Sequence, residues 1–232
     1  MTTPWMIDEL AHAGPEHLDE AFVAAFDRKQ GFPDPGPDLA ALRTHGVGPD
    51  ATVLDLGAGT GRFALAAAGS FDRVIAVDIS PAMAGVITRR ARERSLANLA
   101  VVTAGFLGYR HQGPPVDAVH TRHALHQLPD FWKTQALERI AALLRPGGVL
   151  RLRDLIYDFA PAEAEDVFAD WMARASRDPL LGYTAEDYAE HIRTEHSTYR
   201  WLLEPMLDAA GFDIVETQYE ARLFGTYTCL RR

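Results

Sequence analysis

Cysteine is almost absent from this sequence: Cys229 is the single cysteine among 232 residues. One thiol cannot form a disulfide within the chain and cannot supply a zinc site built from several cysteines. Scarce cysteine is typical of proteins that fold in a reducing compartment. We therefore expect a cytoplasmic protein, in which Cys229 acts as a small buried hydrophobic residue.

Long apolar runs are also missing. No stretch approaches the ~18 apolar residues that a membrane-spanning helix needs. The first residues, MTTPWMIDELAHAG, carry acidic side chains where a secretory signal peptide would carry an apolar run. The sequence therefore predicts no targeting to the secretory route and no membrane partner.

Positive charge is in the minority. The chain has 32 Asp and Glu against 23 Lys and Arg, which gives a formal net charge of -9. Since nucleic acids attract basic proteins, this balance disfavours a nucleic acid as partner. The run TRRARERS (88–95) concentrates four arginines, and we interpret it as the solvated face of a helix.

Short apolar runs that predict strands alternate with helical patterns in the middle of the chain. The predicted strands are 52–56, 73–79, 99–105, 116–121 and 149–156. Strands that alternate with helices at these lengths predict a parallel sheet with helices on both faces, which is an α/β fold.

Two segments depart from this alternation. Residues 1–45 predict an N-terminal helical cap segment, and residues 158–201 predict a polar, helical insertion that caps the substrate. The core would then consist of residues 46–157 and 202–232. Its last part reads as a helix followed by two strands, which we expect to form an antiparallel hairpin.

The loop after the first predicted strand, LDLGAGTGRF (54–63), lacks two features of phosphate-binding loops. A dinucleotide fingerprint has a glycine at its sixth position, where this sequence has Arg62. A loop that cradles nucleoside triphosphates ends in Gly-Lys-Ser/Thr, which is absent here. Both nucleotide interpretations are weakened, although this edge of a parallel sheet is where ligands bind.

Two carboxylates near this loop, those of Asp55 and Asp78, indicate a ligand of another kind. Asp55, in the strand before the glycines, suits a ligand with an ammonium group. Asp78 ends the second strand, where a carboxylate can accept hydrogen bonds from two ribose hydroxyls. The ligand would then have a ribose and a cationic or amino-acid-like arm, without a pyrophosphate. S-adenosylmethionine meets that description.

Four segments in order, VLDLGAGTGRF, VIAVDISPAM, DAVHTRHALHQLPD and LLRPGGVL, resemble the successive motifs of class I S-adenosylmethionine-dependent methyltransferases. The resemblance covers roughly residues 50–155, and the final AAGF with its two strands resembles the family's closing helix and hairpin. It implies a Rossmann-like, doubly wound sheet of seven strands in the order 3-2-1-4-5-7-6, with the last strand antiparallel.

The resemblance also assigns residues to the cofactor. Asp55 would face the methionine amine, Asp78 would hold the ribose, and Gly61 would admit a closely packed helix. Where the family commonly has an acidic residue that reaches the adenine amine, this sequence has Gly105, so adenine recognition would rest on backbone groups and on Phe106. The cofactor-binding set is Asp55, Gly57, Ala58, Gly59, Gly61, Asp78, Ile79, Met83, Phe106 and Arg122.

Methyl transfer depends chiefly on alignment of the reactants, so it has no obligatory catalytic residue. His126 and Asp154 are the candidates for a general base. For His126, a structural role in the loop stays an alternative. Asp154 has the alternative of pairing with Arg151 or Arg153, because arginines in a central strand need partners when buried.

Histidines recur at His120, His123 and His126, a spacing that invites a metal site. The first would lie in a strand and the others in a loop or first helical turn, so their side chains need not converge. No acidic cluster like that of magnesium-dependent relatives accompanies them. We expect no metal.

The stretch RTEHSTYRW (193–201) gathers aromatic and basic side chains at the end of the predicted insertion. We predict a substrate wall there, with packing against the core as the alternative. The candidate substrate-binding residues are Tyr157, His196, Tyr199 and Trp201.

The sequence thus predicts an enzyme that transfers a methyl group from S-adenosylmethionine to oxygen, nitrogen or carbon of a small molecule. The alternative is a regulatory or assembly protein that binds S-adenosylmethionine without transferring its methyl group. A nicotinamide-dependent oxidoreductase is a third interpretation, which the missing sixth glycine disfavours. A homodimer stays open.

Overall fold

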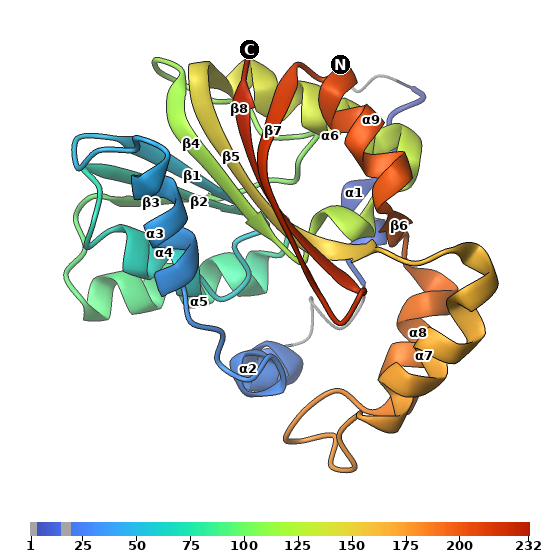
Figure 1. The fold of residues 1–232 in the computed structure, drawn as a ribbon. Coiled ribbons are helices and arrows are strands. Elements are labelled where there is room, and N and C mark those ends of the chain that lie inside the picture. The colour runs from blue at the N-terminus through green and yellow to red at the C-terminus, as the bar shows by residue number, and fades with distance from the viewer. Residues whose placement is uncertain (1–3, 15–19) are drawn as a thin grey trace.

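The computed structural model describes residues 4–14 and 20–232, and its centre is one twisted sheet between two layers of helices (Figure 1). The strand order is β3-β2-β1-β4-β5-β8-β7. Strands β1 to β5 run parallel, and β8 runs antiparallel to both β5 and β7. The predicted order and the antiparallel strand are confirmed. The strands are β1 (Thr52–Leu56), β2 (Arg73–Asp78), β3 (Leu99–Thr103), β4 (Val116–Arg122), β5 (Leu144–Tyr157), β6 (Thr198–Tyr199), β7 (Phe212–Glu220) and β8 (Phe224–Arg231).

The numbering differs from the prediction because of β6. This two-residue strand lies off the main path and pairs with the end of β5, at Ile156 and Tyr157. Its sequence, Thr-Tyr, is too short to show strand periodicity, so the sequence gives no signal for it.

The two faces of the sheet bury different residues of the same strands. On β1, Val53 packs with helices α3 (Gly36–Thr44), α4 (Arg62–Ala67) and α5 (Pro81–Glu93). Its neighbour Leu54 points to the opposite face, which is covered by α6 (Asp130–Leu143) and α9 (Arg200–Ala209). Alternation along one strand therefore builds two apolar cores.

The remaining helices lie beyond the carboxyl ends of the strands (Figure 1). From the N-terminal segment come α1 (Glu9–His12) and α2 (Glu20–Lys29), and the insertion supplies α7 (Ala164–Ala173) and α8 (Ala185–Thr194). A separate aromatic cluster, which includes Tyr157 and Trp171, joins α7 and α8 to the end of β5. Residues 1–3 and 15–19 of the predicted N-terminal segment lie outside the described residues. Within the described ranges, no helix combines the length and apolar character needed to cross a membrane.

The N-terminal segment is fastened to the core by Asp27 at the end of α2. Its carboxylate accepts a hydrogen bond from Thr60 Oγ1 and lies 2.7 Å from the guanidinium of Arg90. Arg90 belongs to the run interpreted as a solvated helix face, and the structure shows that it pairs with a buried carboxylate instead. The glycine loop is thereby covered by a segment that precedes it in the chain.

A buried ion pair connects α3 to the centre of the sheet. Arg151 of β5 donates from Nε to Asp38 Oδ1 at 2.8 Å and from Nη1 to Thr228 Oγ1 at 2.7 Å. Arg153 pairs with Glu220 at 2.6 Å. The arginines of this strand therefore have partners other than Asp154, and the alternative pairing considered from the sequence is wrong.

We predict that Asp38→Ala lowers the free energy of unfolding by about 3–5 kcal/mol, because Arg151 would stay buried without its carboxylate partner. Glu186→Ala, which breaks the exposed pair with Arg193 on α8, should cost at most ~1 kcal/mol. Urea unfolding followed by circular dichroism measures both. Equal losses in the two variants would mean that the buried pair does not hold α3 in place.

Candidate functional site

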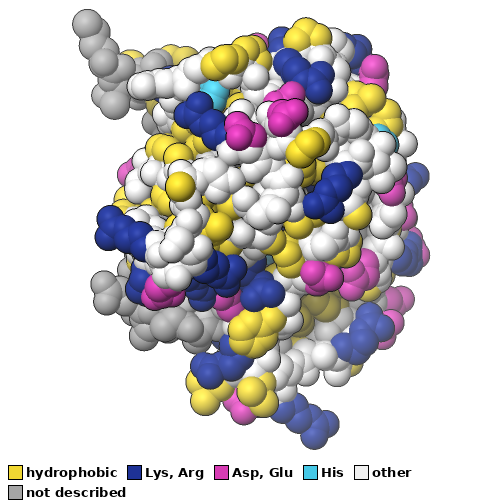
Figure 2. Space-filling model, turned by 90° about the vertical axis from the view of Figure 1, so that its left-hand side faces the viewer, with side chains coloured by type: hydrophobic (Ala, Val, Ile, Leu, Met, Phe, Trp, Pro, Cys, Tyr) yellow, Lys and Arg dark blue, Asp and Glu magenta, His cyan; other side chains and the backbone are white. Residues whose placement is uncertain are grey.

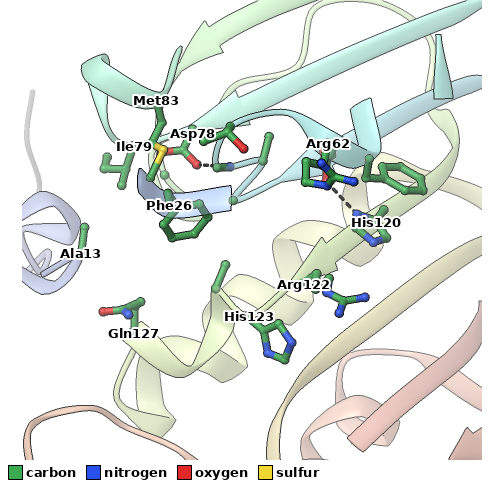
Figure 3. Close-up of a pocket in the computed structure, with 18 of the residues that line it drawn as sticks. Ala13, Phe26, Arg62, Asp78, Ile79, Met83, His120, Arg122, His123 and Gln127 are labelled. Carbon is green, nitrogen blue, oxygen red and sulfur yellow. Dashed lines mark hydrogen bonds and ion pairs between the residues drawn. The ribbon is translucent and has the colours of Figure 1, made fainter. Parts of the chain in front are cut away.

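A cavity lies at the carboxyl ends of β1, β2 and β4, where the glycine loop faces the N-terminal segment (Figure 3). It encloses about 1100 Å³, including space that is open to solvent. Nine of the ten predicted cofactor residues line it, and Gly61 is the exception. Gly61 has a φ of +81°, and a Cβ there would lie 2.9 Å from Ile87 of α5, so this glycine permits close helix packing.

Gly57 allows the backbone of the glycine loop to lie close to the loop that follows β4. Its φ is +70°, and a Cβ at this position would lie 2.3 Å from the Cβ of Ala124. Its N–H donates to Val77 O at 2.9 Å, which holds the turn against β2. A side chain is excluded here on both conformational and steric grounds.

Asp55 presents an unpaired oxygen in the buried floor of the cavity. Its Oδ1 lies 2.7 Å from His120 Nδ1, whereas Oδ2 has no hydrogen-bond partner. A buried carboxylate oxygen without a partner is costly unless a ligand donates to it. This oxygen can accept a hydrogen bond from an ammonium group.

His120 links Asp55 to a second carboxylate. Its Nε2 lies 3.6 Å from Asp38 Oδ2, and its ring stacks on Phe63 at 3.7 Å between centroids. Burial alone lowers the pKa of His120, but the carboxylates of Asp55 and Asp38 raise it above its ordinary value. The sequence placed His120 in a strand and missed this role, which the parallel pairing of Asp55 with His120 across β1 and β4 would have shown.

Asp78 ends β2 and faces the other end of the cavity (Figure 3). It accepts hydrogen bonds from the N–H groups of Gly59 at 2.7 Å and Ser80 at 2.9 Å. Burial raises the pKa of Asp78 to about 6, although these two donors oppose the shift. Each oxygen keeps a lone pair for a further donor. The apolar side chains of Ile79 and Met83 lie beside it.

Glu9 of α1 lies where the sequence lacks an acidic residue. Its carboxylate accepts hydrogen bonds from Leu107 N at 3.0 Å and Gly108 N at 2.8 Å. A Cβ built on Gly105 would lie 2.3 Å from Glu9 Oε2, so only glycine admits this carboxylate. Glu9 and Phe106 both line the cavity. Glu9 could not be predicted from the sequence, because it lies about a hundred residues before the loop that it contacts.

Arg122 ends β4 and His123 follows it, and both line the cavity opposite Asp78 (Figure 3). The guanidinium of Arg122 lies 3.6 Å from Asp38 Oδ2. His123 has a φ of +49°, unusual for a residue with a side chain. Its buried Nδ1 has no hydrogen-bond partner, and burial lowers its pKa to about 3. His123 is therefore a neutral imidazole with a free buried nitrogen, and its ring packs edge-on against Phe224 of β8 at 5.5 Å between centroids.

The two predicted base candidates lie together, outside the lining of the cavity. His126 Nδ1 is 2.5 Å from Asp154 Oδ1, and His126 Nε2 is 2.8 Å from Glu195 Oε2. Burial alone would lower the pKa of His126, but the two carboxylates raise it to about 10. Both ring nitrogens face carboxylates, so this geometry leaves none directed at a substrate.

The four predicted substrate residues also lie away from the cavity lining. Tyr157 and Tyr199 pack in the aromatic cluster below β5, 5.7 Å apart between centroids. Trp201 stacks on Tyr199 and is 53% exposed. The carbonyl of His196 accepts a hydrogen bond from Lys133. Their packing follows the alternative considered from the sequence.

The fold and the cavity define an enzyme of the Rossmann-like class that binds a nucleoside cofactor at the switch point of its sheet. The description "Methyltransferase domain" belongs to the family model that matches residues 53–148. The match covers less than half of the chain, and it shows a methyltransferase domain of the class I, S-adenosylmethionine-dependent type, with S-adenosylmethionine as the cofactor.

Two proteins with similar sequences are also described as methyltransferases. An uncharacterized methyltransferase from Geobacillus kaustophilus is 26% identical over 216 residues, which cover 90% of this chain and 94% of that protein. A second, from Oceanobacillus iheyensis, is 24% identical over 115 residues, so the chain spans 52% of its length.

Solved structures show the same fold. The magnesium protoporphyrin IX methyltransferase from Synechocystis PCC 6803 with bound SAM superposes with a TM-score of 0.67 at 17% identity, over 99% of this chain and all of that one. A SAM-dependent methyltransferase from Aquifex aeolicus gives a TM-score of 0.64 at 16% identity, over 92% of this chain and 99% of that one.

We predict that Gly57→Ala weakens S-adenosylmethionine binding at least about tenfold, the equivalent of ~1.4 kcal/mol, because the new methyl group displaces Ala124 or the loop. Gly46→Ala is a matched control, since Gly46 also has a positive φ, +85°, but nothing lies within 4 Å of its Cβ position. Calorimetric titration compares the two variants. If both bind the cofactor like the parent chain, the close approach at Gly57 has no role in binding.

Proposed function

We propose that this methyltransferase acts on a small molecule that enters the cavity beside the cofactor. The observation that carries the proposal is the cover that the N-terminal segment forms over the glycine loop. Phe26 lies 3.4 Å from the Cβ position of Gly59, and the Arg62 Nε donates to Pro33 O at 3.0 Å. A cavity covered this closely suits a small acceptor better than a folded RNA or protein.

The surface supports the same choice. On the face shown in Figure 2, basic and acidic side chains are interspersed with apolar ones and form no broad patch of one sign. Together with the net charge of -9, this gives a polyanion little to bind on that face. The finding favours a small acceptor over a nucleic acid.

The cavity residues fit S-adenosylmethionine. When bound, the cofactor supplies an electrophilic methyl group on a sulfonium. We assign Asp55 Oδ2 to its ammonium group, the free lone pairs of Asp78 to the ribose hydroxyls, and the backbone at Gly57 to close contact. Ile79, Met83 and Phe106 would flank the adenine.

We assign the adenine amine to Glu9. The carboxylate lies beside the loop after β3, where the family commonly carries an acidic residue, and it retains lone pairs after binding two backbone N–H groups. Gly105 would then be required for the entry of Glu9, and the N-terminal segment would complete the cofactor site.

Arg122 and His123 would face the acceptor. With a pKa of about 3, His123 is too weak a base to accept a proton from a hydroxyl at neutral pH. It can still donate or accept a hydrogen bond as a neutral ring. We therefore propose that the reaction relies on alignment, and that the acceptor arrives as a neutral amine or an anion.

The raised pKa of Asp78 predicts a pH dependence of cofactor binding. The carboxylate accepts ribose hydrogen bonds when ionised, and it gains a proton as the pH falls through about 6. Affinity should therefore decline below about pH 6. Asp78→Asn should bind about 10–100-fold more weakly at pH 8, from the ~1.5–3 kcal/mol of hydrogen bonds to a charged group, and should lose the pH dependence.

Calorimetric titrations from pH 5 to pH 8 measure this effect. Asp170→Asn, at an exposed site on α7, serves as the control and should follow the parent chain. A pH profile that survives in Asp78→Asn would assign the titration to another group and remove Asp78 from the ribose site.

To test the acceptor class, purified protein and labelled S-adenosylmethionine are incubated with the low-mass and the macromolecular fractions of a cell extract. We expect label to enter the low-mass fraction. His123→Asn tolerates the left-handed backbone, and it should raise the acceptor KM while the cofactor affinity stays unchanged. Label confined to RNA or protein would overturn the small-molecule proposal.

A further inference from the structure

Three side chains that the proposed reaction does not use converge at the junction of the cap and the core. His126 lies in the short helical turn Leu125–Gln127 that follows β4. His191 and Glu195 lie one turn apart, at the end of α8 and just after it. One ligand-type atom from each residue lies within 4.8 Å of the other two. Glu195 Oε2 is 2.8 Å from His126 Nε2 and 2.6 Å from His191 Nδ1.

The opposite nitrogen of each histidine has its own partner. His126 Nδ1 lies 2.5 Å from Asp154 Oδ1, and His191 Nε2 lies 2.8 Å from Ser197 Oγ. A metal ion would replace the inner proton that Asp154 and Glu195 hold on His126 in its absence, and the lone pairs of His126 Nε2 and His191 Nδ1 would then be directed to that ion. Histidines that bind metals are oriented in this way by a carboxylate or another oxygen on the far nitrogen.

The contacts of Glu195 are short but poorly directed for hydrogen bonds. Its buried Oε2 has no hydrogen-bond partner, although two ring nitrogens lie within 2.8 Å. The oxygen thus lies off the N–H directions of both rings. An ion between the three atoms, at ~2.0–2.2 Å from each, would need them ~3.3 Å apart. Glu195 Oε2 would therefore have to withdraw by roughly half an ångström from each of the two nitrogens.

The negative charges of the neighbouring carboxylates also favour a bound cation. Asp154 and Glu195 bring two carboxylates to two imidazoles in a largely buried space, and a divalent cation would balance them. Two histidines and one glutamate form a donor set that zinc prefers, with a fourth position open. Gln127 marks the open side, since its amide lies 3.1 Å from His126 Nε2 and it also lines the cofactor cavity.

We infer that His126, His191 and Glu195 form a binding site for one divalent transition-metal ion of the zinc type, which ties α8 of the cap to the loop after β4. This replaces the expectation of no metal, which considered His126 only with His120 and His123. His191 and Glu195 lie some seventy residues further along the chain, so sequence spacing could not bring them to His126.

The test uses the full chain, treated with a chelator, dialysed and titrated with Co²⁺. We expect one ion per chain, with the visible absorption of tetrahedral Co²⁺, and displacement by Zn²⁺. Zn²⁺ should also raise the thermal unfolding temperature, because it binds the folded state. Cofactor affinity is measured in parallel, so that failure of the metal site is distinct from failure of the cofactor site.

Glu195→Gln and His191→Gln should each weaken Co²⁺ binding by at least about tenfold, as even the outer partners of metal ligands do when removed. His111→Gln is the matched control, since this histidine bonds Tyr109 and the carbonyl of Pro114 away from the cluster. Absence of stoichiometric Co²⁺ binding in the parent chain would overturn the inference and leave a cluster of imidazolium and carboxylate pairs. Unchanged binding in both folded variants would overturn it as well.

Discussion

The pairing of His120 with two buried carboxylates is the interaction on which the rest of the site depends. Asp55 comes from β1 and Asp38 from α3, and the imidazole between them belongs to β4. If the ring carries a proton, one positive charge serves two negative ones and Arg151 adds the other. The floor of the cofactor cavity is therefore an electrostatic network, and it holds Asp55 with one oxygen free because the other is engaged.

The N-terminal segment is the second element of this arrangement. Glu9 reaches the loop after β3, and Asp27 fastens α2 to Thr60 and Arg90. In both places a side chain from the start of the chain contacts backbone or side chains of the nucleotide-binding core. Arg62, whose presence excluded a dinucleotide fingerprint, binds the carbonyl of Pro33. Arg62, which stands where a dinucleotide-binding loop has its sixth glycine, thus attaches the N-terminal segment to the glycine loop.

Residues within the repeating strand–helix pattern could be predicted from the sequence, because local periodicity and the glycine loop determine them. The strand order and the cofactor residues are implied by the resemblance of four ordered motifs to the methyltransferase family, and nine of those ten residues line the cavity. Glu9 and Phe26 could not be predicted as cavity residues, since their places depend on contacts between distant segments, whereas His120 follows from the pairing of β1 with β4. The substrate role predicted for Tyr157, Tyr199 and Trp201 stays a prediction: the three rings pack together outside the cavity lining, and a local cluster of rings is as typical of packing as of a substrate wall.

The loop from His123 to Gln127 connects the two parts of the molecule. On one side His123 and Gln127 line the cavity, and on the other His126 meets α8 and β5 through Glu195 and Asp154. The loop is only five residues long and begins with a left-handed residue. We therefore expect a displacement of His126 by α8 to shift His123 and Gln127 as well, at the end of the cavity where the acceptor is proposed to bind. Asp78 and Met83, which we propose to contact the cofactor, lie on β2 and α5, but Ala124 of this loop packs against Gly57 of the glycine loop. Under the proposed function, the sheet, its glycine loop and Glu9 hold the methyl donor, whereas the acceptor meets Arg122 and His123 at the end of β4, and the cap acts on the acceptor only through this loop.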